Sequence, residues 1–307
     1  MLNIWTLPED AVQLGMSSGN DADVSISPPS ILPSLSNLTI GCNPGKRLCR
    51  RSSRLQPKAS TAALDFDTVE RDGDGRVIYV DLASSMTGAR TTAVMRTLQA
   101  RLATIQPSQA QLLRMPLINR SRVLVEMEDQ VALSLFCAWM LEILSGSSST
   151  IGAAVRELMA PLGQSMLLLG GHFICPRVTE YEPRISQQTP HTDVETIGEV
   201  VGIGLHTRNE FMHTLIDPHA TLDSEGNVHD GSGFRQANTP AFAFETGAVH
   251  AGPGVPHVPG PYPRFITDRI FFLLCSADLP PTHVAKHRAD NGLVGRANLV
   301  IDLPPAN

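Results

Sequence analysis

The sequence has no run of about eighteen apolar residues, the length that a single helix needs to cross a membrane. Its first residues, MLNIWTLPEDAVQLG, carry acidic side chains where a secretory signal would carry basic ones followed by an apolar core. These absences exclude a transmembrane helix and give no sign of export. We therefore expect a cytoplasmic or otherwise intracellular protein with no membrane partner.

Basic residues are also scarce, because 24 lysines and arginines stand against 30 aspartates and glutamates, for a formal net charge of −6. Affinity for a phosphate backbone depends on clustered positive charge, so this balance does not favour a nucleic-acid partner. It favours a small-molecule substrate. The one dense basic stretch, GKRLCRRSSRLQPK, is interpreted as a solvated tail, with a targeting or docking element as the alternative.

Cysteines number only five and form no metal-binding pattern. Cys137 and Cys275 lie in apolar runs, which is typical of buried free thiols. Cys42 and Cys49 are seven residues apart with no CxxC or histidine beside them, so a zinc site there is not expected. The sequence also lacks GxGxxG, P-loop and GxSxG patterns, which removes support for a nucleotide-binding fold or a serine hydrolase.

Composition divides the chain into two parts. Residues 1–63 are rich in serine and proline without apolar periodicity, and they predict a flexible N-terminal segment. Residues 64–307 are expected to form a single domain. Within it, a strand is predicted over 76–82, and helical spacing of apolar residues predicts a helical part at about 84–162. Its helices are expected over 84–105, 130–144 and 150–162.

The spacing of apolar residues changes at about residue 165, and the new pattern continues to about residue 303. Short apolar or alternating runs there are separated by Gly, Pro, Asp and Asn, which is typical of strands in a sandwich or barrel. The runs are MLLLGGHFICPRVTEYEP, IGEVVGIGLHT, EFMHTLID, PAFAFETGAVH, RFITDRIFFLLCS and ANLVIDL. Helices followed by strands predict an α+β fold in which the N-terminal helices cover one face of an antiparallel β-core.

Two histidine motifs stand out in this second part. In Pro-His191-Thr-Asp193, residues i and i+2 of an extended segment point to the same side, so the imidazole and the carboxylate can share one ion. In TGAVHAGPG, His250 ends an apolar strand before a Gly/Pro loop. Two histidines and one carboxylate leave half of an octahedral coordination sphere open, which suits Fe(II) that activates dioxygen. We therefore predict metal ligands at His191, Asp193 and His250.

The segments RVTEYEPRISQQTPHTDVE and TGAVHAGPG resemble the metal-binding strand and the distal-histidine segment of Fe(II)/2-oxoglutarate-dependent oxygenases. The similarity covers roughly residues 165–280 and is to the phytanoyl-CoA hydroxylase-like or prolyl hydroxylase-like members. It implies a double-stranded β-helix (jelly-roll) core at about 165–303. It also implies Fe(II), 2-oxoglutarate and O2 as cofactors, with ascorbate as a reductant, and oxidation of a substrate C–H bond with release of succinate and CO2. The acidic Asp193, where halogenases of this group have a small residue, favours hydroxylation or another oxidation.

The cosubstrate's distal carboxylate calls for a buried arginine, whose planar fork pairs with both oxygens. Arg264 lies 14 residues beyond His250, and Arg269 lies 19 beyond it but opens the most apolar strand. Only one of the two is expected to point inward, and the position favours Arg269. Gln188 precedes His191 on the same extended segment and is a further candidate to line the cosubstrate pocket.

Several alternatives stay open from the sequence. His257 competes with His250 as the third ligand, although it lies between prolines in a predicted loop. A cupin-like metalloenzyme that does not use 2-oxoglutarate, and a non-catalytic β-sandwich binding protein, compete with the oxygenase. The long polar segment 217–236 predicts part of a substrate mouth or a lid, because long loops inside compact domains are usually functional.

Overall fold

The computed structural model describes residues 68–303 except 87–88, 118–121, 147–149, 195, 207–213, 259, 261, 263, 266–268 and 296–297. The segment predicted to be flexible, 1–63, lies outside the described residues. Contacts divide the chain between Gln56 and Pro57, and every element below belongs to the second unit, Pro57–Asn307.

Strands dominate the described elements. They are β1 (Val69–Arg71), β2 (Val77–Asp81), β3 (Arg122–Glu126), β4 (Ser165–Val178), β5 (Val200–His206), β6 (Thr214–Asp217), β7 (Thr221–Leu222), β8 (Val228–His229), β9 (Arg235–Ala237), β10 (Ala241–Glu245), β11 (Val249–Ala251), β12 (Arg264–Phe265), β13 (Arg269–Ser276) and β14 (Leu299–Asp302). The helices are η2 (Ala83–Met86), α1 (Ala89–Thr104), α2 (Gln109–Arg114), α3 (Gln130–Ser145), α4 (Thr150–Met159), η3 (Ala160–Leu162) and α5 (Pro281–Asp290).

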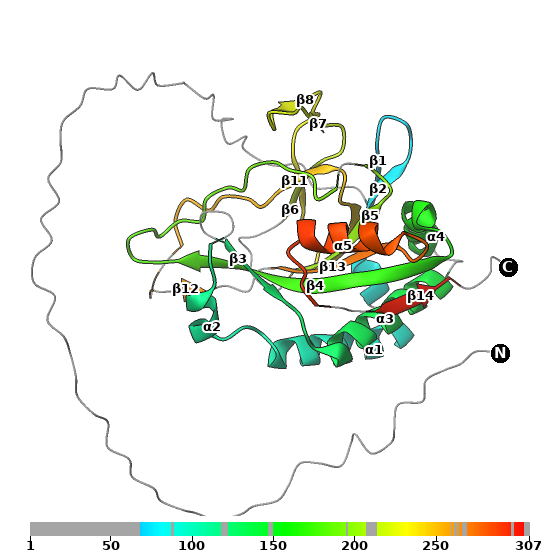
Figure 1. Cartoon of the computed structure of the whole chain (residues 1–307), viewed down its shortest axis with the longest axis horizontal. Helices are drawn as coiled ribbons and strands as arrows, with labels where there is room; N and C mark the ends of the chain where they lie inside the picture. The colour runs from blue at the N-terminus through cyan, green and yellow to red at the C-terminus, as the bar shows by residue number, and fades with distance from the viewer. Residues whose placement is uncertain are drawn as a thin grey trace, which may run out of the picture. The chain divides into compact units, whose positions relative to one another are not determined.

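Nine of these strands form one large antiparallel sheet in the order β1-β2-β10-β5-β13-β4-β12, with β3 and β14 also pairing with β4. A smaller antiparallel sheet has the order β11-β6-β9, and β7 pairs with β8 in a separate hairpin (Figure 1). The α+β class with a large antiparallel sheet, predicted from helices followed by strands, is confirmed.

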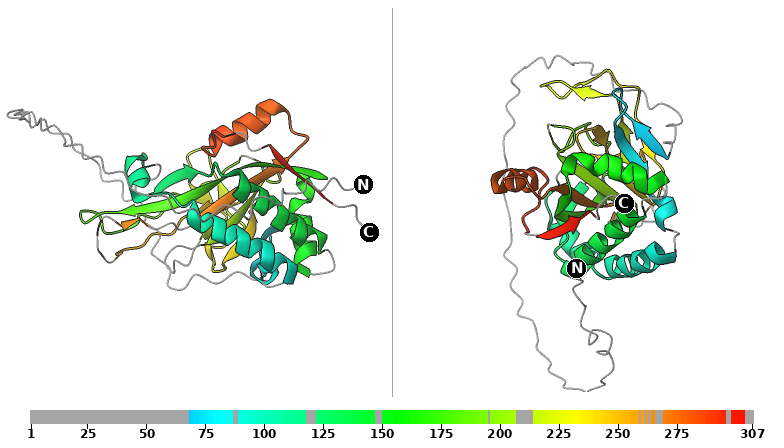
Figure 2. Two further views of the ribbon diagram at one scale, coloured as in Figure 1. Left: turned by 90° about the horizontal axis from the view of Figure 1, so that it is seen from below. Right: turned by 90° about the vertical axis from the view of Figure 1, so that its right-hand side faces the viewer.

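The helices cover one face of the large sheet. Figures 1 and 2 show α1 and α3 along this face, while α5 lies across the sheet from them. Asp129 caps α3, since its carboxylate accepts a hydrogen bond of 2.8 Å from the Ala132 amide. The Phe136 ring of α3 stacks on Phe272 of β13 at 4.0 Å between centroids and 9° between planes. This contact joins the helical layer to the centre of the sheet, where a stacked aromatic pair contributes about 1 kcal/mol beyond burial.

The opposite face of the large sheet carries a second core, shared with the small sheet. Phe242 and Phe244 of β10 lie opposite Gly204 and Gly202 of β5. A Cβ atom at Gly204 would lie 2.3 Å from Phe242 Cζ, and one at Gly202 would lie 2.6 Å from Phe244 Cε1. The two glycines therefore leave the space over β5 that the phenyl rings fill.

The predicted strand over 76–82 and the helices over 130–144 and 150–162 agree with β2, α3, and α4 followed by η3. The helix predicted over 84–105 is divided into η2 and α1. Each of the six predicted β runs contains observed strands. The sequence did not predict β3 or α5, because both are short and their apolar residues follow no clear period.

No helix in the described part of the chain is by itself long and apolar enough to span a membrane. The segments Gln130–Ser145 and Thr150–Leu162 reach that length and composition only as a pair, which is bent by 114°.

Candidate metal centre

Two segments far apart in the sequence run antiparallel at the edge of the small sheet. Ile185 pairs with Val255, and His191 pairs with His250 through two backbone hydrogen bonds of 3.0 and 2.9 Å. The Asp193 amide then donates to the Thr246 carbonyl at 3.0 Å. These backbone bonds place the HxD motif beside the histidine that the sequence offered as its partner.

His191, Asp193 and His250 converge in space. One ligand-type atom from each, an imidazole nitrogen or a carboxylate oxygen, lies within 4.8 Å of the others. His250 Nε2 lies 3.3 Å from Asp193 Oδ2, and His191 Nε2 lies 3.6 Å from Asp193 Oδ1. His250 is buried, while the His191 and Asp193 side chains keep about a third and a quarter of their surfaces exposed. The cluster is thus buried on the side of His250 and partly exposed on the side of His191 and Asp193.

Both histidines are held by the same local hydrogen bond. His191 Nδ1 lies 2.9 Å from the Thr189 carbonyl, and His250 Nδ1 lies 2.9 Å from the Ala248 carbonyl. Because a carbonyl only accepts, each Nδ1 must carry the proton and donate it. Nε2 of His191 is then left with a lone pair, which faces the Gln188 amide nitrogen at 3.2 Å and can instead bind a metal ion. Nε2 of His250 faces Asp193 Oδ2 at 3.3 Å.

The two histidines of the cluster differ in their ionisation. Burial, together with the nearby His250, lowers the pKa of His191 to about 4, so its ring is neutral at pH 7. Burial opposes ionisation of Asp193, but His250, His191 and His172 outweigh it and hold the pKa of the carboxyl below its usual value. Burial also opposes protonation of His250, but Asp193 outweighs it and raises the pKa of that ring. The carboxylate is ionised and available to a cation.

Gln188 connects this cluster to the next residues along the strand. Its Nε2 lies 3.2 Å from His191 Nε2, and its Oε1 accepts a hydrogen bond of 3.0 Å from the Gly252 amide. The Gln188 amide donates in turn to the Gly252 carbonyl at 2.9 Å. The side chain predicted to line a cosubstrate pocket therefore lies beside the metal-binding cluster.

Arg269 is buried at the start of β13, with 2% of its surface exposed, and its Nη1 donates to Thr214 Oγ1 of β6 at 2.8 Å. Its Nη2 is 2.9 Å from where a Cβ atom of Gly252 would lie, and Arg122 Nη2 is equally close. Gly252 is two residues beyond His250, which on a strand is roughly 7 Å. Two guanidinium groups thus approach a glycine two residues from the histidine.

Arg122 was missed by the sequence analysis. From β3 it donates through Nη1 to the Ser186 carbonyl and through Nη2 to the Pro253 carbonyl, both at 2.5 Å. These carbonyls belong to the two segments that carry the histidines, so Arg122 ties the two segments together. No motif surrounds it, and only the pairing of β3 with β4 brings it here.

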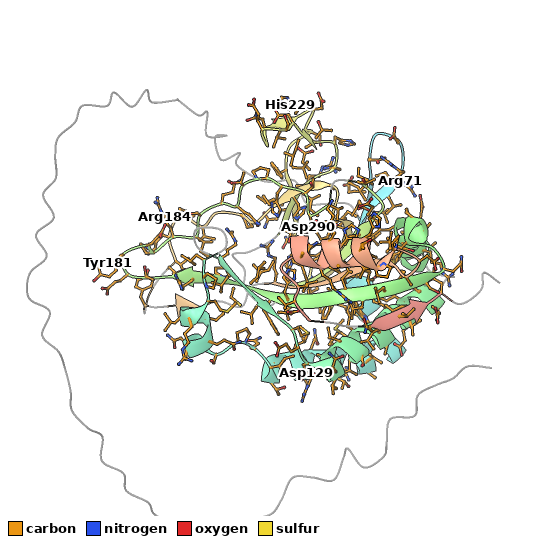
Figure 3. All side chains as sticks on the ribbon, viewed as in Figure 1. Arg71, Asp129, Tyr181, Arg184, His229 and Asp290 are labelled. Atoms are coloured by element: carbon orange, nitrogen blue, oxygen red, sulfur yellow. The ribbon has the colours of Figure 1, made fainter. Side chains whose placement is uncertain are left out.

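The other candidates lie elsewhere or outside the description. The backbone of Arg264 pairs with Val178 in β12, but its side chain is not among the described ones. His257 is exposed and does not join the His191 cluster. Apart from these candidates, the Tyr181 side chain is 91% exposed at the turn that follows β4, near Arg184 (Figure 3).

His172 is a further buried histidine that the sequence did not single out. It lies on β4 directly opposite Phe271 of β13, is 8% exposed, and its Nδ1 has no hydrogen-bond partner in the described part of the chain. Burial lowers its pKa to about 4, while Asp193 acts to raise and Arg269 to lower it. His172 is therefore neutral at pH 7 and lies within electrostatic reach of both charged groups.

No protein-family model and no curated protein sequence matches this chain. The solved structures that resemble it include non-heme iron and 2-oxoglutarate enzymes. The epimerase SnoN, in complex with Fe3+, alpha-ketoglutarate and nogalamycin RO, is 13% identical with a TM-score of 0.43, over 77% of this chain and 92% of that one. HygX from Streptomyces hygroscopicus, with nickel and 2-oxoglutarate bound, is 11% identical with a TM-score of 0.36, over 66% and 83%. At these values the likeness carries no argument about function, which depends on the residues themselves.

Proposed function

We propose that this protein is an Fe(II)/2-oxoglutarate-dependent oxygenase whose metal ligands are His191, Asp193 and His250. The observation that carries the proposal is the convergence of these three side chains beside a buried arginine. Two imidazoles and one ionised carboxylate present their ligand atoms together, and Arg269 lies near Gly252, two residues along from His250.

The donor set fits Fe(II) better than a structural zinc. Nitrogen and carboxylate oxygen donors suit iron, and three protein ligands leave positions for further ligands. Structural zinc favours thiolates, and among the described residues no cysteine joins the cluster. Burial raises the pKa of Cys137 to about 12 and that of Cys275 to about 11, and neither residue belongs to the cluster.

The charges beside the cluster suit a dicarboxylate such as 2-oxoglutarate. One end of this five-carbon molecule would chelate the metal, and the other carboxylate would meet Arg269, held by Thr214. The separation of roughly 7 Å along the strand between His250 and Gly252 suits a ligand of this length. Gly252 lets both guanidinium groups approach the strand closely, because any side chain there would collide with them.

When bound, iron and 2-oxoglutarate would supply the oxidising power, with succinate and CO2 as products of the cosubstrate. The protein's own residues would orient the metal ligands and the cosubstrate, and would exclude water from the site. Nδ1 hydrogen bonds fix the histidine rings, Arg269 fixes the cosubstrate, and Phe244 packs edge-on against His250 at 5.2 Å between ring centroids. This aromatic side keeps water from the buried half of the site.

The two antiparallel sheets with an apolar core between them are proposed to be a jelly-roll of the double-stranded β-helix type. The substrate is proposed to be a small organic molecule that approaches the exposed side of His191 and Asp193. A retained carboxylate at Asp193 leaves no place for a halide ligand, so hydroxylation or another C–H oxidation is favoured.

The test is anaerobic iron binding, followed by succinate formation when Fe(II), 2-oxoglutarate, ascorbate and air are supplied. We expect one iron per chain, and we expect His191→Ala and Asp193→Ala to abolish both iron binding and succinate formation. Iron binding without 2-oxoglutarate consumption would instead identify a cupin-like metalloenzyme. Absence of bound iron would identify a non-catalytic β-sandwich protein.

A further inference from the structure

We propose that His172 is a cosubstrate-binding residue, which donates an Nδ1 hydrogen bond to a carboxylate oxygen at the metal-proximal end of bound 2-oxoglutarate. This inference rests on the proposed function and assigns a role to a side chain outside the metal ligands and Arg269.

The first observation is the state of the His172 side chain. It is more than nine-tenths buried, and its Nδ1 makes no hydrogen bond in the part of the chain that the structure describes. A buried polar atom without a partner is destabilising and uncommon in native proteins. A bound ligand that accepts a hydrogen bond from His172 Nδ1 would explain why this atom has no partner among the described residues.

The second observation is the register of the strands. Arg269 lies opposite Ile174, whereas His172 lies opposite Phe271, two residues further along both strands. Phe271 contacts Phe244 at 5.6 Å between centroids, and Phe244 contacts His250 at 5.2 Å. His172 itself lies 6.0 Å from the Phe271 ring. The imidazole thus lies on the metal side of Arg269.

The third observation is the pair of charges that act on His172. Asp193 of the metal cluster and Arg269 influence it with opposite signs. His172 therefore lies within electrostatic range of both ends of the proposed 2-oxoglutarate site. Because a carboxylate only accepts hydrogen bonds, the neutral imidazole must take the tautomer that carries its proton on Nδ1.

The experiment measures 2-oxoglutarate and oxalate affinity by calorimetry on anaerobic Fe(II)-loaded full-length protein. Oxalate chelates a metal but lacks the distal carboxylate. His172→Phe, which keeps the ring size and removes the donor, is expected to weaken binding of both ligands about tenfold. Arg269→Met is expected to weaken 2-oxoglutarate alone. His172→Asn, whose amide nitrogen takes the position of Nδ1, is expected to recover part of the affinity.

A second readout separates ligand binding from a structural role. The metal-free His172→Phe protein is expected to melt at or above the wild-type temperature, because a ring of similar shape replaces a buried polar atom. His287→Phe, a buried histidine in α5, is the matched control and should leave both affinities unchanged.

Wild-type affinity for both ligands in His172→Phe would overturn the inference and leave the proposed function intact. A loss that 2-oxoglutarate shows and oxalate does not would also overturn it, as would a lower melting temperature of the metal-free variant. If the wild-type protein binds iron but no 2-oxoglutarate, the proposed function fails, and this inference fails with it.

Discussion

In the proposed function, Arg269 is the residue that separates a 2-oxoglutarate enzyme from other iron proteins. Its guanidinium group is buried between the two sheets and oriented by Thr214, and the absence of a side chain at Gly252 lets it approach the strand that carries His250. A planar group fixed in this way can form two parallel hydrogen bonds with one carboxylate.

We expect Arg269→Met to weaken 2-oxoglutarate binding roughly 100-fold, the effect of removing one partner of a buried charge pair. Arg269→Lys should recover only part of this loss, because an ammonium group cannot form the bidentate contact. Calorimetry on the anaerobic iron-loaded protein measures both variants, and iron affinity should not change. The matched control is Arg264→Met; if it weakens binding and Arg269→Met does not, the assignment of the two arginines is reversed.

Glu245 gives the fold a pH dependence of its own. It is buried at the end of β10, and burial raises its pKa from an ordinary 4.5 to about 7, although the Gly198 and Gly247 amides oppose the shift. A carboxyl group with a raised pKa in the folded state favours folding while it is protonated. Its contribution is therefore complete below pH 4.5 and is lost as the pH rises through 7.

We expect Glu245→Gln to be more stable than the wild type above pH 7, by on the order of 3 kcal/mol if the whole shift is expressed. The difference should shrink steadily as the pH falls to 4.5. Urea unfolding at several pH values measures it. A stability difference that does not change with pH would show that Glu245 titrates normally in the folded protein.

At the residue scale, the sequence indicated which side chains meet at the centre but not all that surrounds them. His191 and Asp193 are two residues apart, so local geometry is enough to bring them together. His172 and Arg122 reach the site only through the pairing of β3 and β13 with β4. Such long-range register leaves no local pattern around either residue.

Among the elements, β5 depends most directly on the absence of side chains. Gly202 and Gly204 face the rings of Phe244 and Phe242 at distances too short for any added carbon atom. This strand lies between β10 and β13 in the large sheet. A clash with the phenyl rings therefore cannot be removed by a shift of β5 alone, as it could at an edge strand.

Gly204→Ala is expected to destabilise the protein by about 1–3 kcal/mol, since overpacking forces Phe242 or the strand to move. Adding Phe242→Leu should recover much of the loss, because the smaller side chain vacates that space. Gly73→Ala is the control, since nothing lies within 4 Å of the added carbon. Chemical denaturation measures all three variants, and equal effects of Gly204→Ala and Gly73→Ala would contradict the packing argument.

The segment 217–236, predicted from the sequence to form a mouth or lid, contains the β7–β8 hairpin and the first two residues of β9. Asp217 holds its base, accepting hydrogen bonds from the His219, Ser232 and Gly233 amides. Figure 3 labels His229 of β8, and the hairpin that carries this residue projects away from the large sheet. The hairpin is thus a folded unit on a fixed base, and its role at a substrate mouth remains a prediction.

Replacing residues 221–229 by a short Gly/Ser linker leaves Asp217 and β9 in place. We expect iron and 2-oxoglutarate binding to be unchanged, because no residue of the proposed site is removed. Turnover of a substrate, once known, should fall, and 2-oxoglutarate consumption without substrate oxidation should rise. Loss of iron binding would show instead that the hairpin supports the metal centre.

At the scale of the whole molecule, the order of helices and strands was sufficient to predict the α+β class. The division of strands into a nine-stranded and a three-stranded sheet was not predictable, because it depends on which distant strands pair. Strand β4 pairs with four others along its 14 residues, and nothing in its apolar run indicates that number.

A protein that begins at Pro57 is expected to keep the complete core, because every described element lies in the unit Pro57–Asn307. Its thermal unfolding midpoint and its affinity for iron should equal those of the full chain. Both can be measured by parallel melting curves and anaerobic titration. A lower midpoint for the shortened protein would show that the first 56 residues stabilise the domain.

The backbone pairing between the two ligand-bearing segments has one more consequence. The amides of His191, Asp193 and His250 each donate to a carbonyl of the opposite segment, and none of these bonds requires an ion. These amides should exchange slowly with deuterium even after a chelator has removed the metal. The two segments would then stay paired in the iron-free protein. We therefore expect iron to bind to a site that is already formed. A chelated sample should regain iron within the mixing time, without refolding.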